Sequence, residues 1–177
     1  MHRLFVAVRP PVAIRNQLLD LMGGVSGARW QADEQIHLTL RFIGEVDRHV
    51  ARDVDAALAS VHHPRFEVTL HGVGAFDRGG EPVTLWAGLR PHEPLRTLHN
   101  KIDQAVARAG VAPDRRAYVP HITLARLPRG AGPVGGFIER SGGISSPLFP
   151  VDEFGLYESR LTPEGALHTL VERYLLD

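Results

Sequence analysis

The chain has 177 residues, 44% of them hydrophobic, which is enough to bury the core of one domain. Its 20 basic and 20 acidic side chains balance, which argues against a protein that coats long nucleic acids and favours a local pocket for an end or a small fragment. There is no cysteine, which excludes disulfides and makes a reducing cytoplasm the expected location. No run of roughly 18 apolar residues indicates a membrane span, and we expect a monomer that does not bind membranes.

Apolar patterning divides the first half of the chain into alternating strands and helices. The predicted elements are a strand at 3–8, a helix at Val12–Met22, a strand at 36–43, a helix at Asp47–Ser60 and a strand at 65–75. Pro11 suits the first turn of the first helix, because no backbone N–H is needed there. Asp47 is the predicted N-cap of the second helix.

The second half repeats this order. The predicted elements are a strand at 83–90, a helix at Leu95–Ala109 with Pro94 in its first turn, a strand at 119–126, a helix at Val134–Ser141 and strands at 148–158 and 167–175. Strands mixed with helices in this order predict an α+β fold, with antiparallel-rich sheets flanked by helices.

Three similarities between the halves recur at nearly the same separation and predict an internal duplication. Phe5–Pro10 resembles Trp86–Pro91, Phe66–Val68 resembles Phe149–Val151, and a histidine motif occurs twice. We therefore expect one domain over residues 1–177 with two pseudo-twofold-related lobes and a central groove. The motif blocks lie near 36–46 and 119–126.

The repeated motif is His-Leu-Thr-Leu at 37–40 and His-Ile-Thr-Leu at 121–124. On a strand the histidine and threonine share one face, because side chains alternate, and the aliphatic residues point to the core. Two such strands facing each other would place His37, Thr39, His121 and Thr123 around one ligand. Two imidazoles and two hydroxyls suit acid–base chemistry on a phosphate ester, because imidazole exchanges protons near neutrality.

The remaining histidines have no spacing that indicates a metal site, and no carboxylate-bearing cluster surrounds either motif. We therefore expect neither a metal nor another cofactor. Trp30 lies just before the first motif strand and is predicted to pack against the fold rather than to stack on a base.

Four segments carry a resemblance to a known family: Arg3–Ala7, Ile36–Val46, Leu85–Leu89 and Val119–Arg126. With them, the chain resembles the two-histidine phosphoesterase superfamily over essentially its whole length. Within it, the chain is similar to the RNA 2′,3′-cyclic phosphodiesterases once described as 2′-5′ RNA ligases. The resemblance implies a two-lobed α+β fold with both motifs in a central groove. It also implies metal-independent hydrolysis of RNA 2′,3′-cyclic phosphate ends or cyclic nucleotides.

The resemblance also implies the role of each motif residue. His37 would be the general acid that protonates the departing 3′ oxygen, and His121 the general base that deprotonates water, which gives a 2′-phosphomonoester. From the residues alone the two motifs are interchangeable. Thr39 and Thr123 would donate hydrogen bonds to the non-bridging phosphate oxygens.

Phe42 and Arg126 occupy equivalent places after the two motif histidines. In the family, the matching ring stacks on a base and the matching guanidinium meets phosphate. Simple alternation places Arg41 rather than Phe42 in the groove, unless a bulge near Gly44 re-aims the strand. Arg126, Phe42 and Arg41 are therefore the candidate substrate-binding residues.

Three other functions stay open at this point. The first is a related phosphodiesterase that acts on 2′-5′ oligonucleotides or on ADP-ribose 1″,2″-cyclic phosphate. The second is a non-catalytic module that binds RNA ends. The third is the reverse reaction, joining RNA ends through a 2′-5′ bond, which microscopic reversibility allows.

Overall fold

The structure is a computed structural model that describes residues 1–177. Its strands are β1 (His2–Val8), β2 (Arg29–Trp30), β3 (Leu38–Val46), β4 (Phe66–Arg78), β5 (Glu81–Arg90), β6 (His121–Arg126), β7 (Phe149–Val151), β8 (Glu153–Thr162) and β9 (Gly165–Leu175). Its helices are α1 (Val12–Leu21), the 3-10 turn η1 (Asp33–Gln35), α2 (Arg48–Leu58), α3 (His92–Arg108) and α4 (Gly135–Ser141). The predicted α+β class is confirmed.

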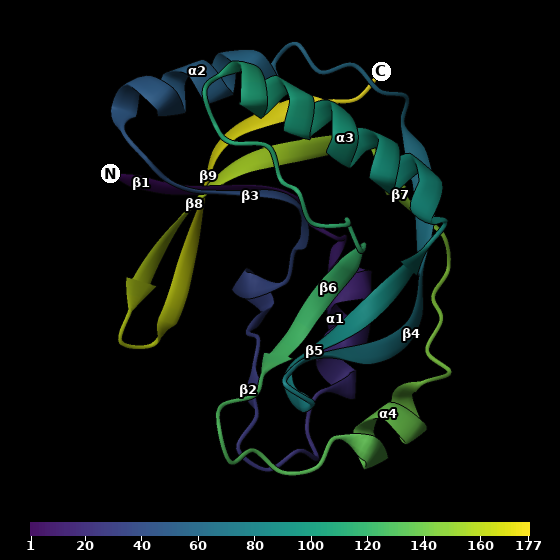
Figure 1. Cartoon of the computed structure of the whole chain (residues 1–177). Helices are drawn as coiled ribbons and strands as arrows, with labels where there is room; N and C mark the ends of the chain where they lie inside the picture. Colours follow the sequence, from purple (N-terminus) through teal and green to yellow (C-terminus); the bar gives the residue numbers. More distant parts are fainter.

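The strands form one antiparallel sheet in the order β7-β4-β5-β6-β3-β1-β8-β9, with β2 paired to β6. Its two central strands, β3 and β6, are joined only where Leu38 pairs with Ile122. The sheet therefore has two parts that meet at this position. Figure 1 shows α2 and α3 beside the part with β1, β3, β8 and β9, and α1 and α4 beside the part with β4, β5 and β6. None of the helices has the length and apolar character that a membrane span requires.

The connectivity of the two halves of the chain is alike. The first half has the order β1-α1-β3-α2-β4, and the second half has the order β5-α3-β6-α4 followed by β7 and β8. The last strand of each half pairs with the first strand of the other half: β4 pairs with β5, and β8 pairs with β1. The similar segments Phe66–Val68 and Phe149–Val151 pair with each other, as Leu38 and Ile122 do. Antiparallel pairing of equivalent segments is the arrangement that a local twofold axis requires. The duplication itself stays a prediction of the sequence.

The predicted strand at 148–158 is wrong as a single element. It is divided at Asp152 into β7, which pairs with β4, and β8, which pairs with β1. The segment thus passes from one part of the sheet to the other. The strand predicted at 65–75 continues to Arg78 and turns through Gly79 and Gly80, both at positive φ, into β5. Two adjacent glycines allow this turn, because they adopt positive φ without a Cβ clash.

The N-terminal ends of the helices have the predicted cap and proline positions. The Asp47 carboxylate accepts a hydrogen bond from the backbone N–H of Val50 at 2.9 Å and caps α2. Pro11 occupies the N-cap of α1, and Pro94 lies in the first turn of α3, which begins at His92. Neither position needs a donor N–H, so both prolines are tolerated.

One hydrophobic cluster fills the interior. The apolar residues of both motifs, Leu38, Leu40, Ile122 and Leu124, are almost completely buried in it. The alternation predicted for the two motif strands therefore holds through the threonines. Burial of the aliphatic side chains fixes the strands so that the motif histidines and threonines face away from the core.

Candidate active site

The four motif side chains lie on one face of the sheet, and we call their positions the square. Leu38 and Ile122 are the one pair between antiparallel β3 and β6, and extending this register by one residue would set His37 opposite Thr123 and Thr39 opposite His121. In this register the two histidines fall on opposite corners of the square.

Two cavities border Thr39, and His37 also lines a third, of about 580 Å³, with Arg9. The first, which we call the His37 cavity, has a volume of about 550 Å³ and is lined by His37, both motif threonines, Arg126 and Trp30 among others. The second, the His121 cavity, has a volume of about 370 Å³, and Phe42, Phe76, Tyr118 and Thr39 line it beside His121. Thr39 borders both. A ligand centred on the square can therefore extend into either cavity.

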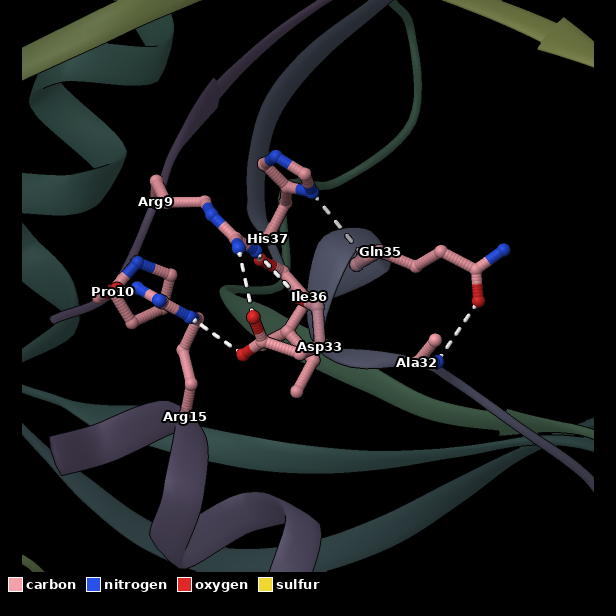
Figure 2. Close-up of polar contacts among 8 residues, drawn as sticks. All are labelled: Arg9, Pro10, Arg15, Ala32, Asp33, Gln35, Ile36 and His37. Atoms are coloured by element: carbon pink, nitrogen blue, oxygen red, sulfur yellow. Dashed lines mark hydrogen bonds and ion pairs between the residues drawn. The ribbon is translucent and has the colours of Figure 1, made fainter. Parts of the chain in front are cut away.

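Both motif histidines are held in the same way. Nδ1 of His37 lies 3.2 Å from the carbonyl oxygen of Gln35 (Figure 2), and Nδ1 of His121 lies 2.6 Å from that of Val119. A carbonyl only accepts, so each Nδ1 carries the proton and donates it. Nε2 is then the ring nitrogen left for proton exchange with a substrate.

Burial and nearby cations favour the neutral form of both imidazoles. Burial lowers the pKa of His37 to about 4; the hydrogen bond to Gln35 opposes this shift, while the positive charge of His168, Arg9 and Arg15 adds to it. Burial also lowers the pKa of His121. A phosphate anion at the square would raise both pKa values, because it stabilises the protonated rings.

Aromatic rings surround each histidine. The centroid of the His37 ring lies 4.7 Å from Tyr157, 5.2 Å from His168 and 5.7 Å from Phe5. His121 is 4.8 Å from Phe76, in an edge-to-face arrangement. The sequence did not point to His168 or Tyr157, because β8 and β9 carry no motif that links them to residue 37.

Arg41 lines the His121 cavity, but its polar contacts are made within the protein. Its side chain is only 6% exposed, and Nε donates to the Asp103 carboxylate at 2.7 Å. The guanidinium also donates to the carbonyl oxygens of Phe42 and Ala112. With its donors used in this way, Arg41 joins β3 to α3 and to the loop after α3.

The reason Arg41 is turned inward is a bulge at Leu40. Along β1, Ala7 is opposite Thr39 and Val6 is opposite Arg41, which leaves Leu40 as an extra residue. Two successive residues, Leu40 and Arg41, are therefore buried, and Phe42 is exposed to 42%. A second register shift separates Phe42 from Gly44, close to the predicted bend.

An equivalent bulge lies in β6. Thr123 is opposite Trp86 and Ala125 is opposite Leu85, so Leu124 is the extra residue. Here too, two successive buried residues are followed by an exposed one, Arg126. Phe42 and Arg126 thus take matching places, Phe42 in the His121 cavity and Arg126 in the His37 cavity.

Arg126 and Trp30 have different surroundings. The guanidinium of Arg126 lies 3.4 Å from the Thr84 hydroxyl and otherwise faces the His37 cavity. Trp30 packs on Phe137 with a centroid distance of 5.3 Å, and its backbone pairs with Ala125. Trp30 therefore has the predicted packing contact, and it also forms part of the cavity wall.

The structure contains no group of three or more His, Cys, Asp or Glu side chains placed to hold one metal ion. The chemistry that the square itself offers is proton transfer from two imidazoles and hydrogen bonding from two hydroxyls.

Comparison with known proteins gives a consistent result. A family model described as the 2′-5′ RNA ligase superfamily matches residues 10–160. The RNA 2′,3′-cyclic phosphodiesterase of Archaeoglobus fulgidus is 31% identical and aligns over 94% of this chain and 96% of its own. The Escherichia coli protein of the same name is 30% identical over 99% and 97%.

Solved structures agree. Escherichia coli LigT in complex with 3′-AMP aligns with a TM-score of 0.81 at 28% identity, over 99% of this chain and 98% of that one. TT0787 of Thermus thermophilus aligns with a TM-score of 0.82 at 28% identity, over 98% and 97%. The resemblance found in the sequence is thereby confirmed, and the chain belongs to the 2′-5′ RNA ligase superfamily.

Proposed function

We propose that this protein hydrolyses RNA 2′,3′-cyclic phosphate ends, and nucleoside 2′,3′-cyclic phosphates, to 2′-phosphomonoesters. The observation that carries the proposal is the pairing of the two His-x-Thr motifs at Leu38 and Ile122, which brings both motifs to one place in the sheet. The relatives aligned over nearly the whole chain are named RNA 2′,3′-cyclic phosphodiesterases, which supports this substrate class.

The proposed reaction is an in-line displacement at phosphorus. His121 takes a proton from water through Nε2, and the water oxygen forms a new bond to phosphorus. The bond from phosphorus to O3′ breaks, and protonated His37 gives its proton to that oxygen, while the bond to O2′ survives. Two histidines are needed because the entering and leaving oxygens lie on opposite sides of phosphorus. The assignment of acid and base follows the family resemblance.

The threonines complete the phosphate site. Thr39 and Thr123 stand beside the two histidines in the square, so their hydroxyls can donate to the non-bridging oxygens. Such donors stabilise the charge that develops on these oxygens in the transition state. Arg126 adds a positive charge in the His37 cavity, and Phe42 offers a ring for a base in the His121 cavity.

The low pKa of His37 fits its role as an acid once a substrate is bound. In the free protein the ring is neutral at neutral pH, because burial and nearby cations disfavour its charge. The phosphate anion offsets these cations and allows the ring to be protonated. Transfer of the proton to O3′ then restores the neutral form that the surroundings favour.

A substrate panel tests the proposal. We expect the highest kcat/KM on an RNA with a 2′,3′-cyclic phosphate end, a 2′-phosphomonoester as product, and an unchanged rate in EDTA. Faster turnover of a 2′-5′ oligonucleotide or of ADP-ribose 1″,2″-cyclic phosphate would support the related phosphodiesterase. Tight binding of the RNA end without turnover would support a binding module. Joined RNA ends at high end concentration would reveal the reverse, ligating reaction.

A further inference from the structure

His37 and His121 are placed by different backbone structures. His121 is the first residue of β6 and is paired with Gly88 of β5. His37 precedes β3, whose pairing with β1 ends at Leu38, and it follows the short turn η1. The position of the His37 ring therefore depends on how η1 is held, and not on a strand ladder alone.

Arg9, at the end of β1, holds this turn. Its Nη1 donates to the carbonyl oxygens of Asp33 at 2.6 Å and Ile36 at 2.9 Å, and its Nη2 lies 3.4 Å from the Asp33 carboxylate. The Gln35 carbonyl, which accepts from the His37 ring, lies between these two carbonyls in the chain. Figure 2 shows the guanidinium of Arg9 directly beside this segment.

A second arginine completes the arrangement. Nε of Arg15 in α1 donates to the Asp33 carboxylate at 2.8 Å, and its Nη1 donates to the carbonyl oxygen of Pro10 at 2.7 Å. The hydrogen bond from Arg15 lowers the pKa of Asp33, so this carboxylate stays charged between the two guanidiniums. The cluster ties β1, α1 and η1 together immediately before His37.

We infer that Arg9 is a positioning residue for His37: through the Asp33 and Ile36 carbonyls it fixes η1 and thereby the direction in which Nε2 of His37 faces the square. The inference rests on the proposed function, since it assigns a purpose to the His37 orientation. Only the first half of the chain has an arginine that holds the turn before its motif histidine in this way. Arg90, which matches Arg9 in the similarity between Phe5–Pro10 and Trp86–Pro91, is exposed.

The arrangement also explains why arginine is needed. A planar guanidinium reaches two carbonyls and a carboxylate at once, whereas an ammonium is a compact donor that cannot span the same acceptors. Arg9→Lys keeps the charge and loses this geometry, and Arg9→Met loses both. Arg90→Met is the matched control from the other half of the chain.

For Arg9→Met we expect kcat to fall roughly 10- to 100-fold, as for other residues that orient a reacting group, with KM within about threefold of the wild type. Arg9→Lys should recover a small part of kcat, and Arg90→Met should match the wild type. Arg9 and His37 also line one cavity of about 580 Å³. A rise in KM at constant kcat would show that it binds substrate directly, and would overturn the inference.

Nitrogen-15 NMR of the imidazoles tests the inference without turnover. In the wild type the His37 signals, identified by their loss in His37→Gln, should report a proton fixed on Nδ1. In Arg9→Met and Arg9→Lys they should report a mixture of tautomers, while the His121 signals stay unchanged. An unaltered His37 tautomer in the folded Arg9→Lys variant would refute the positioning role, whatever the enzyme's substrate proves to be.

Discussion

Leu38 and Ile122 lie opposite each other as the one paired position between the two central strands, and this pair sets the geometry of the whole site. A slip of one residue in either strand would turn its histidine and threonine into the core. Such a slip would also expose the two buried aliphatic residues of that motif, which are Leu38 and Leu40 in β3 or Ile122 and Leu124 in β6. The hydrophobic core thus fixes the relative placement of the catalytic candidates.

The threonines should contribute to catalysis as hydroxyl donors. Thr39→Val and Thr123→Val keep the shape of the side chain and remove the donor, so we expect kcat to fall by roughly 10²-fold for each. Thr39→Ser and Thr123→Ser should retain most of the activity. Steady-state kinetics on a nucleoside 2′,3′-cyclic phosphate measures the effect. Valine variants as active as the wild type would remove both hydroxyls from the proposed mechanism.

Arg41 should matter for stability rather than for substrate binding. Arg41→Met leaves the Asp103 carboxylate without its close partner, which costs about 3–5 kcal/mol when a buried ion pair loses one member. Urea denaturation measures this change. The control is Arg116→Met, whose side chain is 84% exposed beside Asp114 and should change stability by less than about 1 kcal/mol. A raised KM with unchanged stability for Arg41→Met would contradict the structural role.

Phe42 should affect binding of the base. Its exposed ring lines the His121 cavity, and stacking of a base on an aromatic ring contributes about 1–3 kcal/mol. Phe42→Ala should therefore raise KM roughly tenfold or more at nearly constant kcat, and Phe42→Tyr should bind like the wild type. Kinetics on cyclic nucleotides and on a cyclic ribose phosphate without a base measure this. An equal effect on the substrate without a base would contradict stacking.

The pH dependence should reflect the lowered pKa values of both histidines. The profile of kcat/KM reports the free protein, and there the pKa of His37 is about 4 and that of His121 lies below its usual 6.5. Deprotonation of the acid, His37, and protonation of the base, His121, both stop the reaction, so the pH profile should be bell-shaped. Both of its limbs should lie below pH 6.5. The basic limb of kcat should lie higher, because bound phosphate raises the pKa of His37. A basic limb of kcat/KM above pH 7 would contradict this description.

Local patterns were enough to predict most of the strands and the capped helices, because alternation and capping depend on neighbours in the chain. Other features depend on partners that are distant in sequence. The bulges at Leu40 and Leu124 exist only relative to β1 and β5, and they determine that Phe42 is exposed and Arg41 is buried. The contacts of Arg41 with Asp103, and of Arg9 with Asp33, join segments that no motif relates.

Phosphorus NMR of a nucleoside 2′,3′-cyclic phosphate, incubated with the wild type and with His37→Ala and His121→Ala, tests the two-histidine mechanism. We expect the wild type to convert the cyclic phosphate signal to that of the 2′-phosphomonoester alone. Each alanine variant, shown to be folded by circular dichroism, should leave the cyclic signal unchanged over the same time. Full conversion by either variant, or a 3′-phosphomonoester as the wild-type product, would contradict this mechanism.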